Sequence, residues 1–304
     1  MMTQSRPEEG RAPPLRARGA FFGWLDIVLL AAALVVCGYF VWRTNVQLHY
    51  RWNWSVIWPW VARFEDKEGF VAGPILVGLA VTLRLAVWGI LLATMIGVVM
   101  GFARTSRRLF FRLVASGYVM LIRNIPPLVF VFVFVFFITS QVLPALGVSE
   151  RVKAWSPATQ WVVEALFGPV ARLENFLVGL ICLAVFTGAY VTEIVRAGLQ
   201  SVPRAQIEAG ESLGLSAFDV RRYVVFPQAL KNVVPALSNQ FIQMIKDSSL
   251  VSLVSVQELA FMAQDIQTST RRVFEVLLFV GALYFIICWS LSLLFARLEH
   301  RNQS

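Results

Sequence analysis

Six stretches of this sequence are long and apolar enough to cross a lipid bilayer. A bilayer core of roughly 30 Å needs about 20 apolar residues in a helix that rises about 1.5 Å per residue. The stretches with few charges over that length are residues 21–42, 73–103, 113–138, 176–195, 233–256 and 273–295. The sequence therefore predicts an all-α, polytopic membrane protein with about six transmembrane helices.

The composition excludes the two obvious alternatives. Of 304 residues, 58% are hydrophobic and only 15% are charged, whereas charged residues approach a quarter of an ordinary soluble domain. A disordered chain needs low hydrophobicity, which this chain lacks. The formal net charge of +9 is compatible with nucleic-acid binding, so the positions of the basic residues must decide between that and a membrane role.

The basic residues give an orientation. Cytoplasmic loops of membrane proteins retain an excess of Lys and Arg. If the N-terminus lies inside, 15 of the 27 basic residues lie in inner segments and 9 in outer ones, with Arg84, Arg123 and Lys246 inside spans. The distribution predicts that both termini are cytoplasmic, and it explains the net charge without a nucleic-acid partner.

The N-terminal region predicts a retained membrane anchor. A basic tail precedes the stretch 21–42, as in a signal peptide, but the apolar part is longer than a typical signal and no small-residue cleavage site follows it. Beyond it lie Trp52, Trp54, Trp58 and Trp60. Because Trp prefers the boundary between water and lipid, an interfacial anchor is favoured over a ligand cage.

The sequence lacks the common catalytic motifs. Cys37, Cys182 and Cys288 lie far apart inside apolar stretches, which is typical of small buried hydrophobes and not of a disulfide set or metal site. There is no H-E-x-x-H pair, no G-x-S-x-G elbow and no Walker A loop. We expect no catalytic residue, no metal and no ATP bound through that loop, so energy for active transport would come from a partner or an ion gradient.

The segment between the fourth and fifth stretches carries the most information. Pro203 suits the first turn of a short amphipathic helix, and Gly214 can adopt the left-handed conformation that ends it. A second helical turn is predicted to begin near Ser216 and to stop at Pro227. Two short helices that meet at a glycine predict a compact knob on the cytoplasmic face.

This segment resembles the EAA loop of ABC importer permeases, whose pattern is E-A-A-x3-G-x9-I-x-L-P. Glu208, Ala209, Gly210, Gly214 and Pro227 reproduce its spacing, with Gly210, Val224 and Phe226 as small or apolar replacements. In that family the loop docks into a groove on the ATPase subunit and transmits its closing motion. The resemblance implies that the coupling residues here are Gln206, Glu208, Ala209, Gly210, Leu213, Gly214 and Pro227.

Further motifs are similar to those of permeases for polar amino acids. They are the segments 78–86, 118–127, 189–196 (A-Y-V-T-E-I-V-R) and 246–250 (K-D-S-S-L). Several relatives have Gln where this chain has Phe130, so no substrate contact is assigned there. The resemblance implies a type I importer fold in the bacterial inner membrane, with one extra N-terminal helix. It also implies an ATPase dimer that carries ATP and Mg, a second permease subunit, identical or homologous, and a periplasmic amino-acid-binding protein.

The domain organisation follows from these assignments. We expect a cytoplasmic basic tail at 1–20, an extra transmembrane helix at 21–42 and a periplasmic or interfacial Trp-rich segment at 43–73. The permease domain then covers 74–296, with its coupling loop at 203–227, and a cytoplasmic tail covers 297–304.

Polar residues inside the spans are candidates for the substrate pathway, because a charge in a bilayer needs a partner, a wet cavity or an end position. They are Arg123, Glu193, Lys246, Asp247, Ser248 and Ser249. Arg123 either braces the helix break at Pro126 or faces the path. Glu193 either pairs with Arg196 one turn away or meets the amino group of a substrate. Lys246 and Asp247 are adjacent, so each is expected to find its own partner.

The function predicted is that of a permease subunit, not an enzyme, in an ATP-driven importer of polar or charged amino acids that works by alternating access. The alternative is a proton-coupled secondary transporter in which Glu193 and Asp247 relay protons. The EAA spacing favours the first, because an ion-coupled carrier has no use for it.

Overall fold

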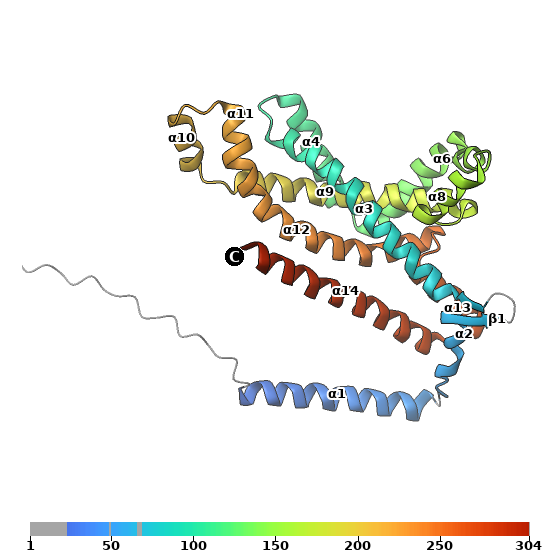
Figure 1. Ribbon diagram of the computed structural model, residues 1–304. Coiled ribbons are helices and arrows are strands. Elements are labelled where there is room, and N and C mark those ends of the chain that lie inside the picture. Colours follow the sequence, from blue (N-terminus) through green and yellow to red (C-terminus); the bar gives the residue numbers. More distant parts are fainter. Residues whose placement is uncertain (1–22, 49, 66–68, 304) are drawn as a thin grey trace, which may run out of the picture. The chain divides into compact units, whose positions relative to one another are not determined.

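The computed structural model describes residues 23–48, 50–65 and 69–303, most of them helical (Figure 1). The α-helices are α1 (Trp24–Leu48), α2 (Trp58–Val61), α3 (Pro74–Thr105), α4 (Leu109–Arg123), α5 (Pro127–Phe134), α6 (Ser140–Leu146), α7 (Val148–Lys153), α8 (Pro157–Phe167), α9 (Leu173–Gln200), α10 (Arg204–Ser212), α11 (Ala217–Asp219), α12 (Phe226–Asp247), α13 (Leu259–Thr270) and α14 (Val273–Gln303). Strands β1 (Ala62–Glu65) and β2 (Gly69–Ala72) form one hairpin. Short 3-10 segments cover Trp54–Val56, Val170–Arg172 and Ser248–Val254, and π-helical segments cover Val135–Thr139 and Val220–Val225.

The chain divides after Trp52 into two units. The first unit contains α1, whose apolar side chains are exposed wherever they are described. The second unit, from Asn53 onward, contains all the other elements. The basic tail predicted for 1–20 lies outside the described residues, and the predicted domain boundaries remain predictions.

Three helices confirm predicted spans. Among the described residues, Pro74–Thr105, Val170–Gln200 and Val273–Glu299 are each long and apolar enough to cross a membrane. They contain the stretches 73–103, 176–195 and 273–295 almost completely. The apolar part of α1, Trp24–Tyr39, is shorter.

Two of the predicted spans are not single straight helices. The stretch 113–138 breaks between α4 and α5, which are bent by 111°. The Pro126–Pro127 pair accounts for the break, as predicted, because proline removes a backbone donor and restricts the residue before it. The stretch 233–256 is also interrupted. Here α12 ends at Asp247, and the Ser248 hydroxyl donates to the Ile245 carbonyl at 2.8 Å where a 3-10 segment begins.

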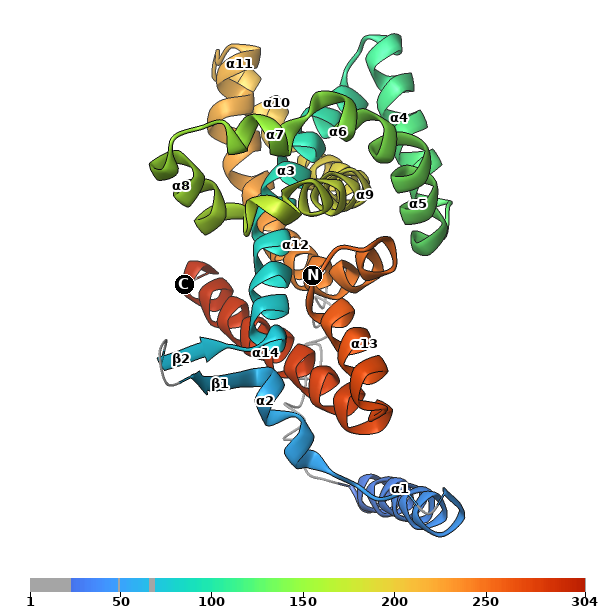
Figure 2. The same ribbon diagram turned by 90° about the vertical axis from the view of Figure 1, so that its right-hand side faces the viewer.

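The hairpin β1–β2 departs from the all-α prediction. Its strands pair antiparallel, with Phe64 opposite Phe70 and their rings 5.8 Å apart. Gly69 has a φ of +72°, which suits the residue that leaves the turn. The Gly73 amide donates to the Val61 carbonyl at 2.8 Å, so the hairpin is fixed to the start of α3 (Figure 2).

The packing of α3 against α9 forms the centre of the second unit. Gly97 and Gly101 of α3 lie against Val191 and Val195 of α9, where an added Cβ would meet the valine side chains. The two glycines thus allow a close approach of the helix backbones, as small residues do in membrane helix pairs. Of the three long apolar helices, α9 is the most buried.

A buried carboxylate joins α3, α13 and α14. Glu258 precedes α13 and accepts a 2.9 Å bond from the Phe261 amide. It also accepts bonds from the hydroxyls of Thr82, at 3.1 Å, and Tyr284, at 2.7 Å. Buried polar groups are costly unless they are satisfied in this way, so the cluster fixes the relative position of the three helices.

Candidate functional site

The segment 203–227 folds into the predicted knob, which stands at one end of α9 and α12 (Figure 1). Pro203 immediately precedes α10, and Gly214 has a φ of +79°, as its predicted helix-ending role requires. Ser216 begins the second arm, and its hydroxyl accepts a 3.2 Å bond from the Asp219 amide. The two short helices predicted from the sequence are therefore present.

The predicted stop at Pro227 is wrong. Pro227 is the second residue of α12, and the helical path runs on from the π-helical segment Val220–Val225 through Pro227 to Asp247. A proline near the beginning of an α-helix does not interrupt the hydrogen bonding there, because the first amides have no intrahelical acceptor. The second arm of the knob is thus continuous with a long helix of the core.

The predicted coupling residues differ in burial. Gly210 is buried, and a Cβ added to it would lie 3.3 Å from a methyl group of Val220. Gly210 therefore brings the two arms together. The other six predicted coupling residues are exposed: Gln206, Glu208, Ala209, Leu213, Gly214 and Pro227.

The knob presents large exposed apolar side chains. Leu213, one of the predicted coupling residues, is 82% exposed, and Phe218 and Tyr223, which the sequence motif did not single out, are 68% and 65% exposed. Exposed large apolar side chains gathered on one projection are a mark of an interaction surface. A search for apolar residues in a predicted cytoplasmic loop would have identified Phe218 and Tyr223.

Two contacts join the end of α9 to α12 beside the knob. Gly198, near the end of α9, lies so close to α12 that an added Cβ would meet the Val233 side chain. The Asn232 side chain of α12 also donates to the Ser201 hydroxyl at 2.7 Å. The knob follows α9 and precedes α12 in the chain, and these contacts hold the two helices together next to it.

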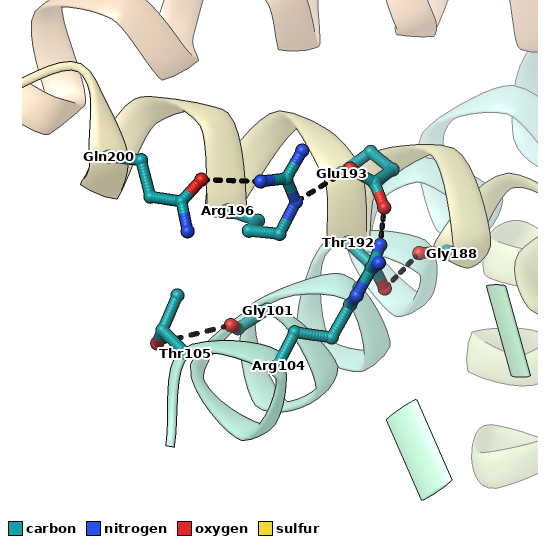
Figure 3. Close-up of polar contacts among 8 residues, drawn as sticks. All are labelled: Gly101, Arg104, Thr105, Gly188, Thr192, Glu193, Arg196 and Gln200. Atoms are coloured by element: carbon teal, nitrogen blue, oxygen red, sulfur yellow. Dashed lines mark hydrogen bonds and ion pairs between the residues drawn. The ribbon is translucent and has the colours of Figure 1, made fainter. Parts of the chain in front are cut away.

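Glu193 lies in a cluster of charged groups near the same end of α9 (Figure 3). It forms the predicted ion pair with Arg196, whose Nε lies 2.8 Å from its carboxylate. It also pairs with Arg104 of α3, a contact that the sequence did not predict. Arg196 continues the chain of contacts to Gln200. The carboxylate is largely buried, so both cations contribute to balancing its charge.

The other five pathway candidates are Arg123, Lys246, Asp247, Ser248 and Ser249, and they do not share one site. Lys246 lines an open cavity of about 610 Å³ between α12 and α14, together with Asn239, Gln243 and Tyr284. Asp247 accepts a 2.9 Å bond from Gln243.

Arg123 lies at the end of α4, with its guanidinium 5.4 Å from the centre of the Tyr190 ring on α9. Ser248 and Ser249 donate to the carbonyls of Ile245 and Lys246, at 2.8 and 2.7 Å. Of the six candidates, only Lys246 lines the cavity between α12 and α14.

The chain matches a known family over most of its length. Residues 89–304 match the family described as binding-protein-dependent transport system inner membrane component. The chain is 31% identical over 252 residues to the glutamine transport system permease protein GlnP of Escherichia coli (strain K12). That alignment covers 83% of this chain and 98% of GlnP. It is 34% identical over 186 residues to the probable glutamine ABC transporter permease protein GlnM of Bacillus subtilis (strain 168), and this alignment covers 61% of this chain and 73% of GlnM.

Solved structures agree with the sequence matches. A crystal structure of an amino acid ABC transporter with histidines aligns with a TM-score of 0.61 and 32% identity, over 75% of this chain and 94% of that one. An inward-facing structure of the MetNI methionine ABC transporter aligns with a TM-score of 0.50 and 17% identity, over 75% and 93%. The second alignment supports the fold alone. The predicted type I importer fold is confirmed.

Proposed function

Since this chain belongs to the family of inner-membrane components of binding-protein-dependent transport systems, we propose that its cargo is a polar or charged amino acid. It is an integral inner-membrane protein and the permease subunit of an ABC importer. Relatives named as glutamine permeases support the choice of cargo. Nothing in these matches supports the proton-coupled alternative.

The knob is the proposed contact with the ATPase. The observation that carries this proposal is the exposure of Leu213, Phe218 and Tyr223 on a projection attached to both α9 and α12. An ATPase dimer would bind ATP and Mg, and this chain would bind neither. A second permease subunit, identical or homologous, completes the proposed assembly.

The proposed pathway uses the in-span polar residues. Lys246 lines the cavity between α12 and α14, where an ammonium group can meet the carboxylate of an amino acid. Arg123, at the helix break, offers a second cation to the same kind of group. Asp247 and Glu193 can receive a substrate ammonium if their present partners give way. Ser248 and Ser249 add hydroxyls at the end of α12.

The proposed orientation places both termini and the knob in the cytoplasm. It rests on the excess of basic residues in the inner segments. The same orientation sets the Trp-rich segment and the hairpin β1–β2 on the periplasmic side, where a binding protein would deliver the cargo.

Reconstitution tests the proposal. The full chain is placed in proteoliposomes with its ATPase, its second permease subunit and its binding protein, and uptake of radiolabelled glutamine, histidine, arginine and glutamate is measured. We expect uptake of at least one of these only with ATP inside and binding protein outside. Uptake driven by a pH gradient without ATP would contradict the proposal.

A further inference from the structure

The segment from the end of α3 to the first turn of α4 concentrates positive charge. Arg104, Arg107, Arg108 and Arg112 lie within nine positions, and residues 69–149 contain no Asp or Glu. Arg107, Arg108 and Arg112 are exposed, and none of them is in an ion pair within the described part of the chain. Arg104 shares Glu193 with Arg196. Three guanidinium groups are thus available to an external anion.

The spacing along α3 sets the depth of these arginines. No charged residue lies in 85–103, between Arg84 and Arg104. Both arginines belong to one continuous helix, so about 1.5 Å per residue separates them by roughly 30 Å, the thickness of a bilayer core. Arg104 therefore marks one boundary of the hydrocarbon, and the three free arginines follow it at the level of the lipid headgroups.

A block of three apolar side chains lies between Arg108 and Arg112, at the start of α4. Leu109, Phe110 and Phe111 are all exposed, Phe110 to 71%, and the two rings lie edge to face 5.6 Å apart. The excess of basic residues that orients a membrane protein requires only the positive charges and does not explain the exposed apolar side chains. Exposed aromatic rings among them suit the boundary where acyl chains meet phosphate groups, because the rings can lie in the hydrocarbon while the guanidinium groups remain wet.

We propose that Arg107, Arg108 and Arg112, with Phe110 and Phe111, bind the headgroup of an anionic phospholipid. A guanidinium group can donate two parallel hydrogen bonds to a phosphate, which favours arginine for this task. The lipid is favoured over a protein partner because the charges lie at headgroup depth beside a transmembrane helix. This inference goes beyond the proposed function and depends only on the placement of α3 in the membrane.

Native mass spectrometry of the purified full chain tests the proposal. The chain is mixed with phosphatidylglycerol or phosphatidylcholine, and bound lipids are counted for R107Q/R108Q/R112Q and for the control R151Q/K153Q/R172Q. The control also removes three exposed positive charges, but on the predicted opposite side. A basic residue near the surface contributes about a fivefold preference for anionic lipid. We expect the first variant to lose most of the preference for phosphatidylglycerol and the control to keep it.

Two results would overturn the proposal. The first is an unchanged preference for phosphatidylglycerol in R107Q/R108Q/R112Q, and a loss of ATPase binding in that variant would then assign these arginines to a protein partner. The second is an equal loss of the preference in both variants, which would indicate a general charge effect. Size-exclusion elution identical to that of the parent chain confirms that the variants are folded, and the single variant R108Q serves if the triple variant does not fold.

Discussion

Arg104 at the end of α3 forms an ion pair with Glu193 of α9, and the same carboxylate accepts a 2.8 Å bond from Arg196 (Figure 3). Two helices that pack through Gly97 and Gly101 are thereby joined again close to the knob. Glu193 thus has a structural role in this state, which it can combine with the proposed contact to a substrate only if Arg104 or Arg196 releases it.

Exchanging the charges of Arg104 and Glu193 separates the structural role of Glu193 from its proposed contact with the substrate. Arg104→Glu and Glu193→Arg, each alone, place like charges together in a largely buried position, and we expect each to lower uptake at least tenfold and to destabilise the protein. The double exchange restores the attraction between α3 and α9, so it should recover much of the thermal stability. Recovery of stability without any recovery of uptake would assign Glu193 to the pathway. Glu193→Gln is expected to weaken uptake while binding of the ATPase is retained.

Gly214 is expected to matter through its backbone. Its φ of +79° costs an L-residue about 1–2 kcal/mol, although no neighbouring atom lies within 4 Å of an added Cβ. Gly214→Val should therefore distort the knob and uncouple ATP hydrolysis from uptake while the core remains folded. Gly117→Val is the matched control, because Gly117 is equally unobstructed but lies in α4. Equal coupling ratios in the two variants would argue against the docking role.

Gly198 is expected to matter through packing. A side chain there would collide with Val233, so Gly198→Leu should separate α9 from α12 and destabilise the protein by about 1–3 kcal/mol. Gly281→Leu, on α14 where no atom lies within 4 Å of an added Cβ, should have little effect. Thermal unfolding in detergent measures both. A similar melting temperature for the two variants would show that the close approach of α9 and α12 does not contribute to stability.

Lys246 is expected to act on the substrate. If its ammonium group donates to a substrate carboxylate in the cavity, Lys246→Gln should raise the KM for uptake about 10- to 100-fold, the usual range for a charge-assisted hydrogen bond. Lys153→Gln, an exposed lysine of α7, should leave the KM unchanged. Unchanged uptake kinetics in Lys246→Gln would remove Lys246 from the pathway.

Local sequence signals predicted three of the spans and the knob because their physical causes are local. Hydropathy placed α3, α9 and α14, the proline pair placed the break after Arg123, and Gly214 placed the end of α10. Pro227 was misread because a proline at a helix start and one at a helix end look alike unless the preceding turns are known.

Contacts between distant segments could not be predicted in this way. The pairing of Arg104 with Glu193 depends on how α3 packs on α9, and no pattern within either segment reveals it. The same holds for Glu258, whose hydroxyl partners, Thr82 and Tyr284, come from two other helices. The hairpin β1–β2 was missed because strands of four residues are too short to show alternation within a Trp-rich segment.

Photo-crosslinking from Leu213 tests the central claim most directly. A benzophenone amino acid replaces Leu213, the most exposed large apolar residue of the knob, and in a second protein it replaces Trp161 of α8, on the predicted opposite side and 71% exposed. After irradiation of the assembled complex in its membrane, we predict a covalent adduct with the ATPase subunit from position 213 and none from position 161. The absence of an ATPase adduct at 213 in a complex that still takes up substrate with ATP would contradict the assignment of the knob as the coupling surface.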